Sequence, residues 1–448
     1  MNRLRTAAWA FCGLASCGGR TLDDIFVAPA ASPAVVSVVT DAGAETGPKD
    51  ASVDADAAPA KVPLPDSATV VDLGLRTTGE LVTFPIPAGT LGFQLVVQAP
   101  DEDALVRIDR LVSPSGQVLF EEGKPRGTEL PTAEGFGWAT AAVPQSDVYS
   151  KSPVESGVFS AKVFGEVSGR VLRVSLVLQK TKDGFFHGGE LDLHVYVPKG
   201  LMLSQPGLRH EVTAQGAAAD DALQARIDAF YELLDALVGV QRGAVSYHGI
   251  GARFTSVLDE PSLRAAFQET RVTPAGQALH VVFTNDLGEA LGVAPAIPGF
   301  AVTTGTSMSA IAVTQYEDSS PEVDAFTMLH EMGHFAGLSH TTEINFDTTD
   351  AGGPPYYDPL ADTPRCNGGV TAENALDCPD YRNVMFPTGD QSTGLLSTGQ
   401  ERVLRGSPIY RARASGPSVF PPRRPLADRF VVAGHSVLRR CVLLRGRR

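Results

Sequence analysis

The sequence predicts two folded parts, an all-β sandwich-like domain followed by an α+β domain. The chain has 448 residues, more than one domain usually needs. Up to about residue 198 the pattern is one of short strands, clearest where Leu191, Leu193, Val195 and Val197 alternate with polar residues. After residue 201 the apolar spacing changes to that of a helix.

The first part, residues 67–200, is expected to be an antiparallel β-sandwich. The candidate strands are residues 81–86, 92–98, 118–120, 170–179 and 191–197. Pro114-Ser115-Gly116 is typical of the turn of a hairpin. His187 and His194 have no metal-ligand partner at a useful spacing, so both are interpreted as structural residues.

The second part, residues 201–410, mixes helices and strands. Apolar residues at helical spacing predict a long helix over residues 217–238, which Gly239 ends. A second helix is expected at residues 261–270, and strands at 278–283 and 309–313. His280 lies inside the first of these strands and is interpreted as a core histidine.

The N-terminus is typical of an export signal. Arg3 and Arg5 precede a short apolar run that ends in Leu14-Ala15-Ser16-Cys17, and this run resembles a bacterial lipobox. Residues 1–16 are therefore expected to be a lipoprotein signal peptide and Cys17 the lipidated residue, which predicts an exported protein anchored to a membrane at the periplasmic or cell surface. The alternative is a plain signal peptide and a secreted protein. Residues 17–66 lack apolar periodicity and are expected to be a flexible tether.

Charge and cysteines narrow the class of protein. The formal net charge of −14 argues against a nucleic-acid partner. Residues 411–448 are basic instead, and are interpreted as a disordered extension. In an exported protein the neighbouring Cys366 and Cys378 are expected to form a disulfide.

The segment that predicts chemistry runs from His330 to His340, HEMGHFAGLSH. His330 and His334 are four residues apart, so a helix that starts near Pro321 presents both imidazoles on one face. Gly337 can end that helix and return the chain so that His340 becomes a third ligand. Three neutral imidazoles leave zinc an open position for water, with Glu331 as general base.

The motif HExxHxxGxxH, with Asn383-Val384-Met385 downstream, resembles the metzincin signature. Residues 358–366 (DPLADTPRC), Cys378 and residues 397–400 (STGQ) narrow the resemblance to the pappalysin branch. The resemblance implies a zinc metalloendopeptidase that acts on proteins or peptides, with Met385 as an apolar floor below the metal. It also implies that the strand at 309–313 is the edge strand that pairs with extended substrate.

Two further implications concern residues near the motif. Calcium is common in that branch, and Asp358 and Asp362, with Asp347 and Asp350, could supply oxygen ligands. A solvated acidic loop is an equally good interpretation. Relatives often carry a tyrosine two residues after the methionine, where this chain has Pro387. Tyr381, Tyr356 and Tyr357 are candidates to replace it in stabilising an oxyanion.

Two other functions are compatible with parts of this pattern. One is a lipid-anchored binding or adhesion protein with a vestigial zinc site, favoured by Pro387 and opposed by the intact Glu331. The other is a gluzincin-type enzyme with a distant glutamate ligand, which would need neither Gly337 nor His340 in register. Whether residues 67–200 form a removable prodomain or a permanent domain is left open.

Overall fold

The computed structural model describes residues 15–16, 68–100, 104–122, 132–149, 151–166, 171–205, 208–272, 276–288, 290–315, 319–342, 358–366, 370–371, 374–387 and 394–413. Cys17, the predicted tether up to residue 66 and the basic residues 414–448 lie outside these ranges, as do Asp347, Asp350, Tyr356 and Tyr357. The predictions made for them are therefore not addressed by the structure.

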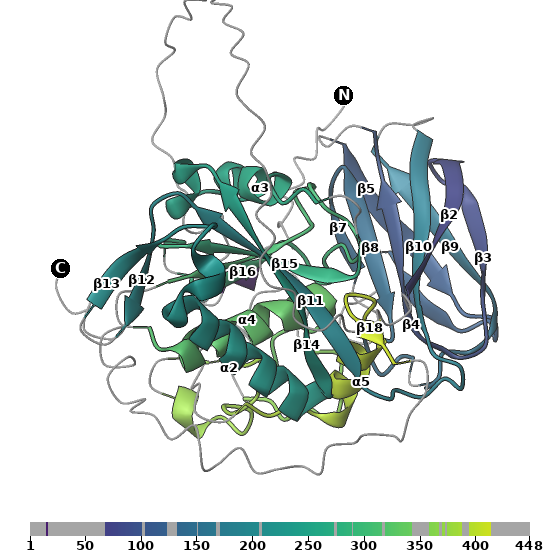
Figure 1. Ribbon diagram of the computed structural model, residues 1–448. Helices are drawn as coiled ribbons and strands as arrows, with labels where there is room; N and C mark the ends of the chain where they lie inside the picture. The colour runs from purple at the N-terminus through teal and green to yellow at the C-terminus, as the bar shows by residue number, and fades with distance from the viewer. Residues whose placement is uncertain are drawn as a thin grey trace, which may run out of the picture.

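The first part of the chain folds into an antiparallel β-sandwich (Figure 1). Its strands are β2 (Ala68–Thr77), β3 (Leu81–Ile86), β4 (Thr90–Gln98), β5 (Leu105–Val112), β6 (Val118–Glu121), β7 (Thr132–Phe136), β8 (Trp138–Val143), β9 (Gly157–Gly165) and β10 (Val171–Lys180). The order is β2-β10-β4-β8-β7-β5-β9-β3, with β6 beside β5. Phe84, Phe93 and Phe159 meet at ring-centroid distances of 5.1–6.0 Å and pack the two layers together.

The predicted strands of the sandwich are confirmed, but the strand at 191–197 lies elsewhere. Gly116 has φ +83° and completes the turn between β5 and β6, as Pro114-Ser115-Gly116 predicts. The strand at 191–197 is β11 (Gly189–Pro198), and it pairs in parallel with β14 (Val240–Ile250) and β15 (Ala278–Thr284). Its assignment to the sandwich is wrong, because alternation fixes one buried face and does not say which sheet supplies it.

The second sheet therefore contains β11, between β15 and β14. The order is β1-β16-β17-β15-β11-β14, with β1 (Ala15–Ser16), β16 (Gly292–Ala294) and β17 (Ile311–Thr314); β18 (Arg411–Ala412) pairs with β11. A boundary at residue 200 would cut this sheet, and a basic tail that starts at residue 411 would remove β18. A short hairpin of β12 (Leu201–Gln205) and β13 (Leu208–Val212) lies apart from it.

The edge of this sheet differs from the expectation. The strand predicted at 309–313 forms as β17, but β17 lies between β15 and β16. The outer strand is β16, which runs antiparallel to β17. In the described residues, the other side of β16 pairs with the two residues of β1. The short β16 was not predicted, because three residues carry too little periodicity to be recognised.

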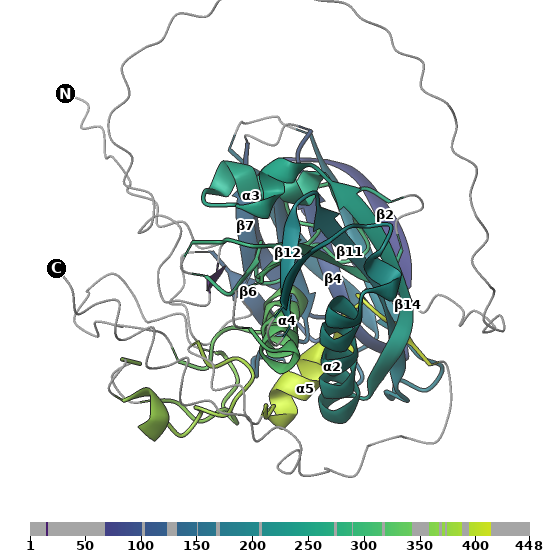
Figure 2. The same ribbon diagram turned by 60° about the vertical axis from the view of Figure 1, so that its left-hand side comes forward.

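Helices cover both faces of the second sheet (Figures 1 and 2). On one face lie α2 (Asp221–Val238) and α4 (Pro321–Ala336), with α5 (Thr398–Gly406) beside them. On the other face lies α3 (Glu260–Gln268). Asp220 caps α2 and Gly239 ends it at φ +84°, so the predicted helix start at residue 217 is a separate 3₁₀ turn.

The described residues thus show the predicted fold class, a β-sandwich-like domain followed by an α+β domain. Among them, no helix combines the length and the apolar character that a membrane crossing requires.

Candidate metal centre

Helix α4 positions two of the three predicted ligands. Ser320 caps it by accepting a hydrogen bond from Val323 N, and Pro321 occupies its first turn. Gly337 ends it with φ +116°, a conformation that side chains with a Cβ rarely adopt. Leu338 N then donates to Gly333 O at 2.8 Å, and the chain turns back as the sequence predicts.

The three histidines come together on the side of α4. Their ligand nitrogens all lie within 4.8 Å of one another, and His330 Nε2 and His340 Nε2 are 3.2 Å apart. The rings stand at steep angles to each other, 83° for His330 and His334 and 69° for His334 and His340. All three side chains are buried, so their nitrogens face one another rather than water.

Hydrogen bonds select the ring nitrogen that is left for a metal. His330 Nδ1 lies 2.7 Å from Val384 O and His334 Nδ1 lies 2.7 Å from Leu338 O, so each Nδ1 donates to a carbonyl and each Nε2 keeps its lone pair. His334 Nε2 is buried without a hydrogen-bond partner among the described residues. Such an orphaned nitrogen, within 4.8 Å of the ligand nitrogens of the other two histidines, fits a metal ligand.

Burial also keeps the imidazoles of His330 and His334 neutral. It lowers the pKa of His330 to about 3, and the neighbouring His340 adds to the shift. The pKa of His334 is lowered well below its usual value for the same reasons. Neutral imidazole is the form that binds a metal ion, so the pocket favours the ligand state at physiological pH.

Glu331, the predicted general base, is fully buried next to the triad. Its carboxylate lies against the backbone of the outer strand β16 at Gly292. A Cβ at Gly292 would lie 2.6 Å from Glu331 Cγ and 2.8 Å from Oε1, and also 2.8 Å from Thr327 Cγ2. Glycine at 292 therefore leaves the space that the carboxylate occupies.

Met385, which the resemblance implies as the floor of the site, packs against α4. It is fully buried, and a Cβ at Gly333 would lie 2.5 Å from its sulfur, so the methionine packs against α4 between His330 and His334. Asn383 Oδ1 accepts from Met385 N at 2.8 Å and so shapes the turn. This arrangement agrees with the Met-turn that the resemblance implies.

Gln400 explains why the STGQ segment accompanies the turn. Its amide exchanges hydrogen bonds of 2.8 and 3.1 Å with the amide of Asn383, and it closes a capping box with Ser397 at the start of α5. The sequence indicates this segment only through the resemblance. The structure shows that α5 and the methionine turn are held together by this amide pair.

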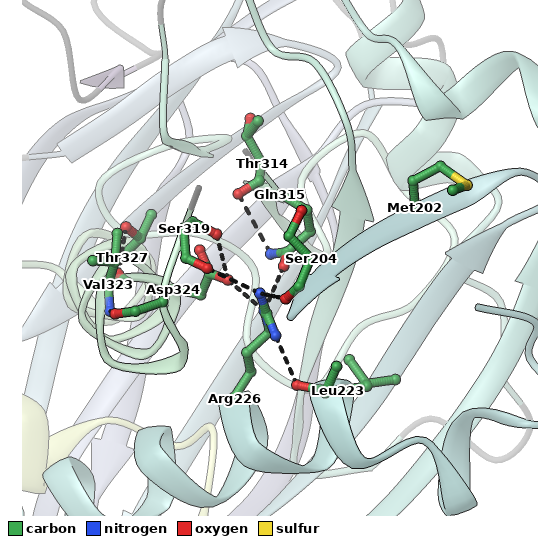
Figure 3. A network of polar contacts seen from close by, with 12 residues as sticks. Met202, Ser204, Leu223, Arg226, Thr314, Gln315, Ser319, Val323, Asp324 and Thr327 are labelled. Atoms are coloured by element: carbon green, nitrogen blue, oxygen red, sulfur yellow. Dashed lines mark hydrogen bonds and ion pairs between the residues drawn. The ribbon is translucent and has the colours of Figure 1, made fainter. Parts of the chain in front are cut away.

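A buried ion pair anchors the start of α4 (Figure 3). Arg226 of α2 donates through Nε to Asp324 and to Gln315, and its other nitrogens reach the carbonyls of Ala222, Ser204 and Ser319. Burial raises the pKa of Asp324 to about 6, although the Arg226 charge acts in the opposite direction. The network ties α4 to α2 and to the end of β17 and was not predicted from the sequence.

The proposed calcium ligands have protein partners instead. Asp358 is buried, which raises its pKa to about 7, and its carboxylate accepts from Leu360 N and Gln400 Nε2. Asp362 accepts from Ser397 Oγ and Gly399 N and so caps α5. The histidine triad is the candidate metal group found within the described ranges, and calcium stays a prediction because Asp347 and Asp350 lie outside them.

The loop that follows the motif is closed by the predicted disulfide between Cys366 and Cys378. Phe386, the residue before Pro387, is buried against Tyr381 with ring centroids 5.5 Å apart. Tyr381 belongs with Val370 and Ala375 to the small core beside this disulfide. The structure thus gives Tyr381 a packing role.

A second group of histidines lies on the opposite face of the sheet. His194 of β11, His248 of β14 and His280 of β15 are neighbours, and His194 Nδ1 and His248 Nε2 are 2.9 Å apart. His280 Nδ1 bonds to the hydroxyl of Tyr196, while its Nε2 is buried without a partner in the described residues. His280 is a core histidine as predicted, but only one of its nitrogens is satisfied. The sequence missed this group because its members come from three separate strands.

Comparisons with known proteins give little further information. No family model and no curated protein matches the chain. Among solved structures it is similar to archaemetzincin from Methanopyrus kandleri, with 15% identity and a TM-score of 0.23 over 49% of this chain and 88% of that one. It is also similar to a family two carbohydrate esterase from Cellvibrio japonicus, with 11% identity and a TM-score of 0.14 over 50% of this chain and 68% of that one. Neither likeness is close enough to carry an argument, so the site itself has to identify the chemistry.

Proposed function

We propose that the protein is a zinc-dependent metalloendopeptidase that hydrolyses peptide bonds of protein substrates. The observation that carries the proposal is the convergence of His330, His334 and His340 beside the buried Glu331. Three neutral nitrogen ligands on a buried site are the donor set of catalytic zinc, which keeps a position open for water. A helix with HExxH that ends in glycine before the third histidine supports the metzincin type.

The chain's own residues divide the chemistry between them. Zinc held by the triad would act as a Lewis acid toward the scissile carbonyl. Glu331 accepts the proton of the attacking water and returns it to the leaving amine. Met385 and Gly333 hold the floor, and the carbonyls of Val384 and Leu338 fix the tautomers of two ligands.

The outer strand β16 supports a peptide as the substrate. Its residue Gly292 lies against Glu331, so a strand paired with β16 would pass the general base. In the full chain, before any signal peptide is removed, Ala15 and Ser16 pair antiparallel with Ala294 and Val293, which supports this edge as one that an extended segment can join. Main-chain pairing of this kind is the common way to bind an extended peptide.

The place of action is part of the same proposal. Residues 1–16 would direct export and Cys17 would carry the lipid anchor, which places the catalytic unit at a membrane surface on the periplasmic or cell exterior side. The disulfide between Cys366 and Cys378 suits such an oxidising compartment. Nucleic acid is not proposed as a partner, because the net charge is −14.

One observation favours a second candidate, a binding or adhesion protein with a vestigial site. Pro387 stands where relatives have an oxyanion-stabilising tyrosine, and Tyr381 is packed beside the disulfide. The buried carboxylate of Glu331 argues against this candidate. A site without catalysis gains nothing from burying an acidic group next to three neutral ligands.

The test is zinc content and cleavage of a denatured protein mixture by the full chain, beside Glu331→Gln. Glu322→Gln, in the first turn of the same helix, is the matched control. We expect about one zinc per chain in all three proteins, cleavage by the parent and the control, and a loss of about 10²–10⁴-fold in Glu331→Gln. Zinc in every protein with cleavage by none would overturn the peptidase and favour the binding protein.

A further inference from the structure

The sandwich packs directly on the loop that follows the outer strand β16. Trp138 of β8 meets Phe300 edge to face with ring centroids 5.3 Å apart. Val96, Ala296 and Met308 complete this buried apolar cluster, which draws residues from both parts of the chain. The contact thus covers residues 296–300 with a core-like surface, as permanent interfaces do.

Gln94 of β4 adds specific hydrogen bonds at the same place. It is 2% exposed, and both ends of its amide are used. Oε1 accepts from Ala301 N at 2.9 Å, and Nε2 donates to Gly299 O. Thr140 Oγ1 donates to Pro298 O at 2.7 Å, so the sandwich fixes the backbone of residues 298–301.

The fixed loop in turn contacts the helix that carries the zinc ligands. Gly299 N donates to Phe335 O at 3.0 Å, and a Cβ at Gly299 would lie 2.3 Å from the Phe335 ring. Phe335 follows His334 in the sequence. The loop is therefore held between Gln94 on one side and the end of α4 on the other.

The segment that follows β8 of the sandwich contacts the glycine turn between α4 and His340. Gln145 is 1% exposed, and its side chain lies 3.3 Å from the position of a Cβ at Gly337. Two residues further on, Asp147 accepts from Ala361 N, pairs with Arg402 at 3.3 Å and donates its own N–H to Pro359 O. The sandwich thus contacts both the glycine turn and the loop that follows it.

We propose that Gln94 is a positioning residue of the zinc site and that the sandwich is a permanent part of the catalytic unit rather than a removable prodomain. This inference rests on the proposed peptidase function. In the described residues the histidine group contains no residue of the sandwich. The sandwich holds the outer strand and α4 at the distance at which Gly292 meets Glu331.

The first experiment compares Gln94→Met with Gln117→Met in the full chain. Both substitutions remove a side-chain amide from the sandwich, but the side-chain amide of Gln117 donates to Val148 O, which belongs to the sandwich itself. We expect kcat/KM on an extended peptide to fall at least about tenfold in Gln94→Met, mainly through KM, with zinc content unchanged. Equal losses in the two variants would overturn the positioning role.

The second experiment cuts the chain between the two parts. A protease recognition sequence inserted after Lys182, which is exposed between β10 and β11, allows the purified protein to be cleaved there. We expect the two pieces to elute together and to keep the activity of the uncut protein. Release of the sandwich with equal or higher activity would show that it is a prodomain.

Hydrogen exchange separates failure of this inference from failure of the proposed function. Backbone amides of residues 292–301 and 333–338 are expected to exchange faster in Gln94→Met than in the parent or in Gln117→Met, whether or not the protein cleaves peptides. Unchanged exchange would overturn the inference even in an active enzyme. Faster exchange in a protein without activity would uphold the positioning contact and reject the peptidase.

Discussion

The protein carries two triads of histidine that differ in the direction of their nitrogen lone pairs. In the triad of His330, His334 and His340 the rings stand at 47–83° to each other and the ligand nitrogens converge within 4.8 Å. The second triad, His194, His248 and His280, lies on the opposite face of the sheet and is called the far-face triad. In it, His194 and His280 stack at 22° with ring centroids 4.8 Å apart. Lone pairs lie in the ring plane, so the stacked rings of His194 and His280 direct them side by side, whereas His248 is tilted by 41° to His194 and meets it at 2.9 Å between ring nitrogens.

The backbone explains this difference. Neighbouring strands are about 4.8 Å apart, and His194 stands directly opposite His280 in the register, so their rings are stacked by the sheet. The metal triad combines two positions on one helix with a third after a glycine turn, which brings the rings in from different directions. Burial lowers the pKa of imidazoles in both triads. Neutral histidine is therefore common to both, and the convergence of three ligand nitrogens distinguishes the candidate ligand set from the packed cluster.

The largest expected effect is on metal binding. His330→Ala removes a converging nitrogen, and we expect zinc affinity to fall by more than about 100-fold together with all peptidase activity. His194→Ala, in the stacked triad, is expected to leave zinc content and activity within about threefold of the parent. Isothermal titration with zinc checks both. If His194→Ala lost zinc as His330→Ala does, the comparison of the triads would be wrong.

The next effect concerns the carboxylate beside the metal triad. Gly292→Ala would place a methyl group on Glu331, so the carboxylate has to move. We expect kcat to fall about 10–100-fold while zinc content stays the same. Gly249→Ala on β14 is the matched control, because its nearest neighbour is 3.6 Å away. Steady-state kinetics and metal analysis measure these two quantities. Equal kcat values for the two variants would reject the contact between Gly292 and Glu331.

A third effect follows from the dependence of the metal triad on the placement of α4. Arg226→Met leaves Asp324 buried without its cation. We expect the free energy of unfolding to fall by about 3–5 kcal/mol, the usual cost of breaking a buried pair. Urea denaturation measures this fall. A change below about 1 kcal/mol would mean that water replaces the guanidinium and that α4 does not depend on the pair.

The smallest effect is a pH dependence of the far-face triad. The pKa of His280 is lowered by burial to about 3, whereas an unfolded chain has about 6.5. Below pH 6.5 the unfolded chain binds a proton that the folded protein does not, so stability falls as the pH drops from 6.5 toward 3. His280→Gln should make this fall shallower by up to about 1.4 kcal/mol per pH unit. The free energy of unfolding of both proteins is measured by denaturation at pH 7 and pH 5 with excess zinc. An identical fall in the parent and in His280→Gln would contradict the prediction.

Much of the metal site could be predicted because it is local in sequence. The spacing of His330 and His334, the cap at Ser320 and the glycine at 337 act within one helix and its two ends. The methionine turn and the disulfide were also anticipated, since each follows a short pattern of residue types. Gln94, Gly292 and Arg226 were not, because each acts through a partner more than 30 residues away.

The sequence by itself determined where the helices and some of the strands form, and which residues are the candidates for the chemistry of the site. Only the tertiary structure decided that β11 belongs to the second sheet, that β16 and not β17 lies at the outer side, and that the sandwich holds the loop beside the zinc helix. The physical reason is that periodicity records which face of an element is buried. It does not record which element does the burying, since any apolar surface of the right shape satisfies the same pattern.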